Sequence, residues 1–243
     1  MLQRMATLSI RLRGCVRRPL MPGVVLALAL GTIAVAVAQS PSGQAQGPAQ
    51  LGEGFEPLFN GRDLTGWGYR PTSEADKESA RRWQASDPNA AAWPIVTEAV
   101  AFDGLPASPD GRFRAEAGRL VVTAPPEGRK IQQLWTTREF PEDFILELEF
   151  RASPNADSGL YLRGPQLQVR DYAVAGPYKT LTKYKPQDWN TIVVTARGGV
   201  AEATCNGELL EAAFKMPATG PIGVEGDRGQ MEYRNIRIKA LRP

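Results

Sequence analysis

Residues 157–171 have the sequence DSGLYLRGPQLQVRD, in which hydrophobic and polar side chains alternate on both sides of a Gly-Pro pair. Successive side chains of a β-strand point to opposite faces. The segment therefore predicts a β-hairpin with one hydrophobic face. The other face is predicted to hold Tyr161, Arg163, Gln166, Gln168 and Arg170.

The turn of this hairpin is predicted at Gly164-Pro165, so that Arg163 lies opposite Gln166 and Tyr161 lies opposite Gln168. An aromatic ring can stack on a sugar, and guanidinium and amide groups can hydrogen-bond its hydroxyls. The polar face therefore suits a polyhydroxylated ligand. The alternative is an ordinary solvated strand face without a ligand.

Short strand-like segments continue along the chain, separated by turns rich in Gly and Pro. Residues 144–151 alternate almost without exception, and Asn206-Gly207 has the composition of a type I′ turn. Only residues 70–92 suit a helix or a long loop. About a dozen short strands with little helix predict an all-β fold, an antiparallel β-sandwich. Strands are predicted over residues 119–123, 131–136, 144–151, 189–196, 200–205, 221–225 and 230–241.

The first 38 residues have the features of a signal peptide. Several arginines precede an apolar run over residues 24–38, which ends in Ala36-Val37-Ala38, a typical cleavage site. The run is short for a membrane span, so export to the periplasm or the cell exterior is predicted, with a retained N-terminal anchor as the alternative. Residues 39–50 are predicted to be a flexible linker, and residues 51–243 a single domain.

Charge and composition exclude several classes of protein. Residues 1–38 hold five Arg and no acidic residue, so their removal leaves 24 basic and 26 acidic residues and little support for nucleic-acid binding. The chain has no His, which excludes Ser-His-Asp and Cys-His nucleophile systems and His-ligated metals. Acid–base chemistry must then use Asp, Glu, Lys, Tyr or a bound metal.

Several short motifs occur in order along residues 54–241. They are FEPLFNGRDLTGW at 55–67, Asp157-Ser158-Gly159 with Arg163, Gln166-x-Gln168-x-x-Asp171, Lys185-Pro186-x-x-Trp189-Asn190, Asn206-Gly207, and Gly220-x-Ile222-Gly223-x-Glu225 with Tyr233-Arg234-Asn235-Ile236. Together they resemble the 3-keto-disaccharide hydrolase domain family. The resemblance implies a concanavalin A-like jelly-roll sandwich and an oxidised sugar or 3-keto-glycoside as substrate.

Two positions depart from the pattern of this family. The family commonly has Glu at the position of Gln166 and Gln at the position of Glu225. Because Gln cannot act as a base, one hypothesis is that Glu225 supplies the carboxylate in this chain. The alternatives are a non-catalytic carbohydrate-binding module of the same fold and an envelope scaffolding protein.

The resemblance implies a base-assisted elimination followed by hydration. A ketone at C3 acidifies the proton on C2, so the site needs a base, a stabiliser for the enolate and a proton donor for the leaving oxygen. Glu225 or Asp171 is the predicted base, Arg163 or Arg170 the stabiliser, and Tyr161 or Tyr178 the donor. Substrate binding is predicted for Gln166, Gln168, Arg170, Asp157, Tyr178, Trp67 and Arg228.

No cofactor is required by the sequence. A divalent cation such as Ca²⁺, held by Asp157, Asp171 or Glu225, is an alternative stabiliser of the enolate. An ordinary glycosidase pair formed by Glu147 and Glu149, which share one strand face, is a further alternative.

The aromatic residues divide between the core and the site. Trp135 and Trp189 are predicted to lie in the core. Trp67 is named among the substrate-binding candidates, where its ring would stack on a sugar, with a place in the core as the open alternative.

Overall fold

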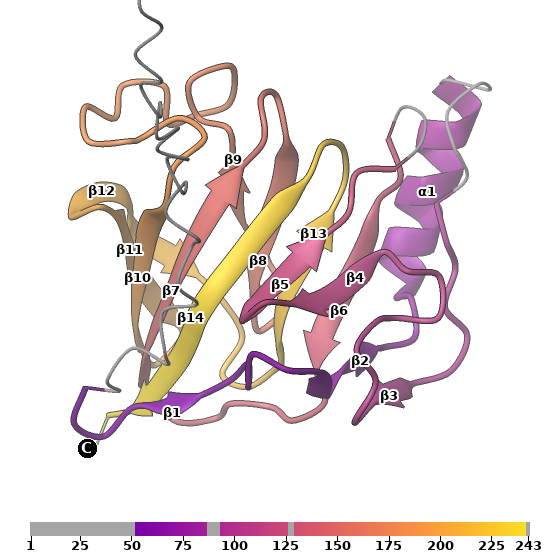
Figure 1. The fold of residues 1–243 in the computed structure, drawn as a ribbon, viewed down its shortest axis with the longest axis horizontal. Coiled ribbons are helices and arrows are strands. Elements are labelled where there is room, and N and C mark those ends of the chain that lie inside the picture. Colours follow the sequence, from indigo (N-terminus) through magenta and orange to yellow (C-terminus); the bar gives the residue numbers. More distant parts are fainter. Residues whose placement is uncertain (1–51, 87–92, 126–128, 242–243) are drawn as a thin grey trace, which may run out of the picture. The chain divides into compact units, whose positions relative to one another are not determined.

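The computed structural model describes residues 52–86, 93–125 and 129–241. These residues form two antiparallel β-sheets and one α-helix (Figure 1). The predicted all-β fold, a jelly-roll sandwich, is confirmed. The predicted signal peptide over residues 1–38 and the linker over residues 39–50 lie outside the described residues.

The first sheet has eight strands in the order β12-β11-β10-β7-β14-β5-β4, and β1 pairs with β14. The long strand β7 is central, because it pairs with both β10 and β14. The bounds of these strands are β1 (Glu56–Pro57), β4 (Phe113–Glu116), β5 (Arg119–Val122), β7 (Phe144–Ala152), β10 (Asn190–Arg197), β11 (Val200–Cys205), β12 (Glu208–Lys215) and β14 (Met231–Ala240).

The second sheet has six strands in the order β3-β2-β6-β13-β8-β9. Its strands are β2 (Leu64–Tyr69), β3 (Val100–Phe102), β6 (Gln132–Thr136), β8 (Asp157–Leu162), β9 (Gln166–Arg170) and β13 (Ile222–Gly226). Helix α1 (Glu74–Ser86) lies within residues 70–92, where a helix or a long loop was predicted. It begins after Ser73, whose hydroxyl accepts a hydrogen bond from the backbone N–H of Asp76 at 3.1 Å.

Hydrophobic side chains from one face of each sheet fill the space between the two sheets. Strand β7 shows this most regularly. Along its whole length, every second side chain, beginning with Phe144, is buried, and the side chains between them are partly exposed. Phe144, Leu146, Leu148 and Phe150 are buried as predicted. The opposite, outer face of each sheet is therefore free to carry polar side chains.

The hairpin of β8 and β9 has a different register from the one predicted. Tyr161 pairs with Gln166, because the turn is centred on Arg163 and Gly164 and not on Gly164 and Pro165. Both central residues have positive φ, 56° for Arg163 and 130° for Gly164. The usual two-residue turn needs that conformation, which Pro165 cannot adopt. The prediction that Arg163 lies on the strand face opposite Gln166 is thus wrong.

Candidate functional site

The candidate site lies on the outer face of the six-stranded sheet. Its residues form two neighbouring rows across the strands, because paired residues on adjacent strands project side by side. Leu134, Leu160 and Val224, which alternate with them, are buried in the core. The first row is Trp135, Gly223, Tyr161 and Gln166, and the second contains Gln133 beside Glu225, and Gly159 beside Gln168.

Glu225 is the centre of a hydrogen-bonded cluster on this face. Its Oε1 accepts a hydrogen bond from the Tyr161 hydroxyl at 2.8 Å, and its Oε2 accepts one from Nε2 of Gln166 at 2.7 Å. The Tyr161 oxygen in turn accepts a hydrogen bond from Gln133 at 3.2 Å. The Glu225 residue is only 7% exposed, whereas Gln166 is exposed. The carboxyl is therefore held in place and lies directly beneath an accessible amide.

The electrostatics of this cluster favour proton transfer near neutral pH. Burial raises the pKa of Glu225 to about 7, and the negative charges of Asp227 and Asp157 act in the same direction. The hydrogen bonds from Tyr161 and Gln166 oppose this rise without cancelling it. Burial and the adjacent carboxylate also raise the pKa of Tyr161, so its hydroxyl stays protonated. A buried carboxyl with such a pKa can act as a general base.

Gly159 makes room for this arrangement. The side chain of Gln166 crosses over Gly159 to reach Glu225, and a Cβ atom at Gly159 would lie 2.1 Å from Nε2 of Gln166. A glycine inside a strand often marks such a close approach. Gly159 was not among the predicted site residues, although its position inside a predicted strand was a usable signal.

A cluster of charged residues lies beside the Glu225 cluster. Asp157 forms ion pairs of 3.3 Å with both Arg170 and Arg228, and it accepts a hydrogen bond from Gln168 at 2.8 Å. Nε and Nη2 of Arg170 are buried without a hydrogen-bond partner. Four residues predicted to bind substrate are thus brought together, next to the predicted base.

Helix α1 is linked through Arg129 to the end of β13, close to Glu225. Nε of Arg129 donates a hydrogen bond to Asp227 at 2.7 Å, and the guanidinium of Arg129 lies 5.8 Å from the centre of the Trp83 ring on α1. Asp227 is two residues after Glu225, so this contact connects the helix to the end of β13.

The predicted role of Arg163 in stabilising an enolate is wrong. Arg163 is buried in the turn after β8, where its guanidinium donates hydrogen bonds to three backbone carbonyl groups. These belong to Gly198, Pro217 and Glu142, at 3.0, 3.3 and 2.6 Å. The guanidinium also lies over the Phe144 ring at 5.1 Å. Arg163 therefore connects the turn after β8 to three other loops by hydrogen bonds. In the described part of the chain, its guanidinium makes no hydrogen bond or ion pair with the Glu225 cluster.

The predictions for Trp67 and Tyr178 are also corrected. Trp67 is completely buried and donates a hydrogen bond from Nε1 to the carbonyl of Leu58 at 2.7 Å, so it cannot stack on a substrate. Tyr178 is 9% exposed and donates a hydrogen bond to Glu211 of β12 at 2.7 Å. It lies against the first sheet, and its hydroxyl is not available to a leaving group at Glu225.

Asp171 is a structural anchor and not a free base. It is 2% exposed, and its carboxylate accepts hydrogen bonds from the Asn155 backbone at 3.0 Å, the Tyr184 hydroxyl at 3.1 Å and Gln187 at 3.4 Å. These three donors come from two different loops. The carboxylate therefore holds the loops to the end of β9.

The outer face of the eight-stranded sheet carries paired charges. Glu147 and Glu149 form ion pairs of 2.6 Å with Arg237 and Arg234. Neither carboxylate is free to act in a glycosidase pair. Trp189 lies partly exposed on this side with Arg234 4.0 Å from its ring centre, and not in the core as predicted.

The family model of the 3-keto-alpha-glucoside-1,2-lyase-like domain matches residues 54–239. The chain belongs to this family. The resemblance drawn from the ordered motifs is thereby confirmed, and the chain is placed among carbohydrate-active proteins. No curated protein matches the chain.

Two solved structures are similar to this family member. A candidate glycosyl hydrolase from Parabacteroides distasonis is 17% identical, with a TM-score of 0.52, over 78% of this chain and 95% of that one. A second candidate glycosyl hydrolase from the same organism is 18% identical, with a TM-score of 0.44, over 55% of this chain and 92% of that one. At these identities the likeness concerns the fold alone.

The two positions at which this family member departs from the family pattern are in direct contact. Gln166 and Glu225 lie on different strands, β9 and β13, with β8 between them. Their side chains nevertheless meet at 2.7 Å across Gly159. One carboxyl and one amide therefore meet at this place on the sheet.

Within the described part of this family member, no group of three or more Asp, Glu, Cys or His side chains is arranged to hold a metal ion. Asp157 and Asp171, two of the predicted ligands, are engaged by the donors described above. The described residues also contain no helix that is long and apolar enough to cross a membrane.

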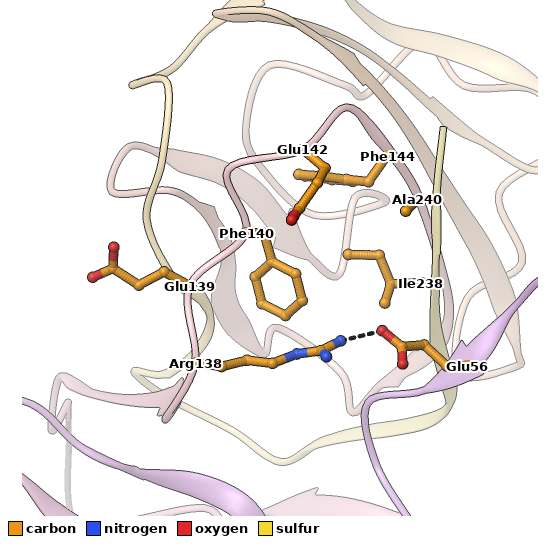
Figure 2. Close-up of a pocket in the computed structure, with 8 residues that line it drawn as sticks. All are labelled: Glu56, Arg138, Glu139, Phe140, Glu142, Phe144, Ile238 and Ala240. Carbon is orange, nitrogen blue, oxygen red and sulfur yellow. Dashed lines mark hydrogen bonds and ion pairs between the residues drawn. The ribbon is translucent and has the colours of Figure 1, made fainter. Parts of the chain in front are cut away.

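A pocket of about 240 Å³ lies apart from the Glu225 cluster. Figure 2 shows Phe140, Phe144 and Ile238 around its apolar part, with the ion pair of Arg138 and Glu56 below them. The Arg138 guanidinium also lies 4.6 Å from the centre of the Phe140 ring. Since none of the residues of the Glu225 cluster lines this pocket, the candidate site remains on the outer face of the six-stranded sheet.

Proposed function

We propose that this protein cleaves the glycosidic bond of 3-keto-glycosides by elimination and hydration, with Glu225 as the base that removes the C2 proton. The observation that carries the proposal is the buried Glu225 carboxyl with a pKa of about 7, placed beside Tyr161 on an outer sheet face. Family membership supports the substrate class.

The chemistry can be written with these side chains. Glu225 takes the C2 proton, and the electron pair of the C–H bond delocalises into an enolate. Expulsion of the oxygen at C1 then forms a C1–C2 double bond while Tyr161 gives that oxygen a proton. The proton on Glu225 returns to Tyr161 through their 2.8 Å hydrogen bond. Water finally adds its hydroxyl to C1 and a proton to C2.

Arg170 is the proposed stabiliser of the enolate. Since Arg163 is committed to backbone carbonyls, Arg170 is the remaining arginine of the two that the sequence suggested. Its guanidinium pairs with Asp157, whose charge acts on Glu225, and two of its nitrogens lack a hydrogen-bond partner. Positive charge near the developing oxyanion lowers the free energy of the transition state.

A carbohydrate-binding module is the second candidate function. It is favoured by one observation: both oxygens of Glu225 already accept hydrogen bonds from protein groups. Under this alternative the cluster is a fixed recognition surface, and a keto-sugar binds without reacting.

A product assay separates the two functions. The protein is incubated with a 3-keto-disaccharide, with and without added Ca²⁺, Mg²⁺ or Mn²⁺, and release of 3-keto-glucose is followed. We expect release by the wild type and a loss of about 100-fold or more for Glu225→Gln, the usual range for removal of a general base. Release by neither protein, with sugar binding retained, would favour the binding module.

Glu211→Gln is the matched control for this assay. Glu211 accepts a hydrogen bond from the Tyr178 hydroxyl at 2.7 Å, as Glu225 does from Tyr161, but on β12 of the other sheet. Its variant is expected to keep full activity. Equal losses for the two variants would contradict a specific role for Glu225.

We also propose that the protein is exported, with a periplasmic or extracellular site of action. The proposal rests on the arginine-rich start, the apolar run over residues 24–38 and the Ala36-Val37-Ala38 site.

A further inference from the structure

Trp135 has a half-buried indole ring beside Tyr161, which is bonded to the proposed base. It lies on β6 with a half-buried side chain and pairs with Gly223 on β13. A Cβ atom at Gly223 would lie 2.6 to 3.0 Å from three atoms of the indole ring. Because Gly223 has no side chain, the indole lies flat against the backbone of β13. The side chain is only half-buried, so part of the ring is accessible to solvent.

The indole also keeps a free hydrogen-bond donor. Within the described part of the chain, Nε1 of Trp135 makes no hydrogen bond, and the ring is half-buried, so this donor is not sealed in the core. By contrast, Nε1 of the buried Trp67 is bonded to a carbonyl oxygen. A flat apolar surface with a polar donor at its edge is the combination that suits a sugar ring.

Trp135 and Glu225 are connected through Tyr161. The ring centres of Trp135 and Tyr161 are 5.0 Å apart with an angle of 58° between their planes, and the Tyr161 hydroxyl donates to Glu225. Trp135 and Glu225 are one strand and two residues apart, which places their backbones at ~8 Å. A single sugar ring with its substituents bridges that distance.

We infer that the accessible part of the Trp135 ring holds the oxidised ring of the substrate and presents its C2 atom to Glu225. This inference rests on the proposed function. Trp135 then contributes binding free energy to the oxidised sugar ring, and the leaving group at C1 extends away from the indole. The contribution of Trp135 should then be the same for every leaving group attached to the same oxidised ring.

The test is a binding titration without turnover. Glu225→Gln is compared with the double variants Glu225→Gln/Trp135→Ala and Glu225→Gln/Trp135→Phe. The probes are 3-keto-maltose and 4-nitrophenyl 3-keto-α-glucoside, and heat of binding is measured by calorimetry. Thermal melting of each variant shows whether it is folded.

We expect the Trp135→Ala change to raise Kd about tenfold or more for both probes, and Trp135→Phe to have a smaller effect. Trp189→Ala in the same background is the control, because Trp189 is also a partly exposed tryptophan but lies on the other sheet. Its Kd values should match those of Glu225→Gln.

Two outcomes would overturn the inference. Equal Kd values for the Trp135→Ala and Trp189→Ala variants would show that Trp135 only packs against Tyr161. An effect confined to one probe would place the leaving group, and not the oxidised ring, on the indole. Failure of the proposed function is distinguishable, since it appears as an absence of product from the wild type while this titration still reports binding.

Discussion

At the scale of single residues, Glu225 is subject to two opposing effects. Hydrogen bonds from Tyr161 and Gln166 favour the carboxylate, whereas burial favours the neutral acid. Burial prevails and the pKa rises to about 7, so both protonation states are present near neutral pH. A group in that condition can take a proton and return it within one catalytic cycle.

This pKa predicts a pH dependence of stability that does not depend on catalysis. The pKa of Glu225 is raised from 4.5 to about 7 on folding, so folding favours its protonated form. The resulting contribution is complete below pH 4.5 and is lost as the pH rises through 7, a change on the order of 3 kcal/mol. Glu225→Gln lacks this contribution. Urea unfolding should therefore show the wild type losing stability relative to the variant between pH 4.5 and pH 7.

A stability difference that stays constant over this pH range would contradict the raised pKa. Glu211→Gln serves as the control for a general effect of removing one carboxylate from a tyrosine hydroxyl.

At the scale of elements, the β8–β9 hairpin delivers the amide of Gln166 to Glu225 across an intervening strand. The crossing requires that Gly159 has no side chain. The hydrogen bond between Gln166 and Glu225 therefore depends on the glycine at position 159 as well as on the two polar side chains.

Gly159→Ala is predicted to displace Gln166 from Glu225. The added methyl group would overlap the amide, so we expect loss of product release together with lower thermal stability. Gln166→Ala in the same chain removes the overlapping side chain. The double variant should regain thermal stability but not activity. If Gly159→Ala keeps full activity, the bond between Gln166 and Glu225 has no role in the reaction.

Sequence alternation predicted the faces of β7, β8 and β9 and placed the Asn206-Gly207 turn, because these signals are local. It missed strand β2, whose Gly66 and Gly68 weaken the strand signal. It also placed Trp135 in the core, where the structure has it half-buried, and it left open the position of Trp67, which is completely buried. Alternation separates the two faces of a strand, but which face the second sheet covers is decided by pairings distant in the sequence.

At the scale of the molecule, the two sheets have different outer faces. On the eight-stranded sheet, Glu147 and Glu149 are neutralised by arginines of β14. On the six-stranded sheet, the carboxyl of Glu225 accepts hydrogen bonds from two neutral groups, Tyr161 and Gln166. The six-stranded sheet thus carries both the ion pairs of Asp157 and a titratable carboxyl that is held by neutral donors.

Export is the prediction that concerns the whole chain. If the segment that ends at Ala38 is a signal peptide, the mature protein should begin at Gln39. Mass spectrometry of the protein purified from a periplasmic or culture fraction measures this start. A full-length chain found only in the cytoplasmic fraction would contradict export.

If Glu225 removes the C2 proton of the substrate, a deuterium atom placed at C2 is lost during the reaction. Measuring this loss of deuterium tests the proposed elimination directly. A 3-keto-disaccharide deuterated at C2 is incubated with the wild type, with Glu225→Gln and with buffer alone, and the 3-keto-glucose formed is analysed by mass spectrometry. We expect wild-type product to carry solvent hydrogen at C2 well above the level found in buffer alone, and Glu225→Gln to form almost no product. Rapid wild-type release of product that retains deuterium at C2 would contradict this expectation, because the glycosidic bond would then be broken without elimination.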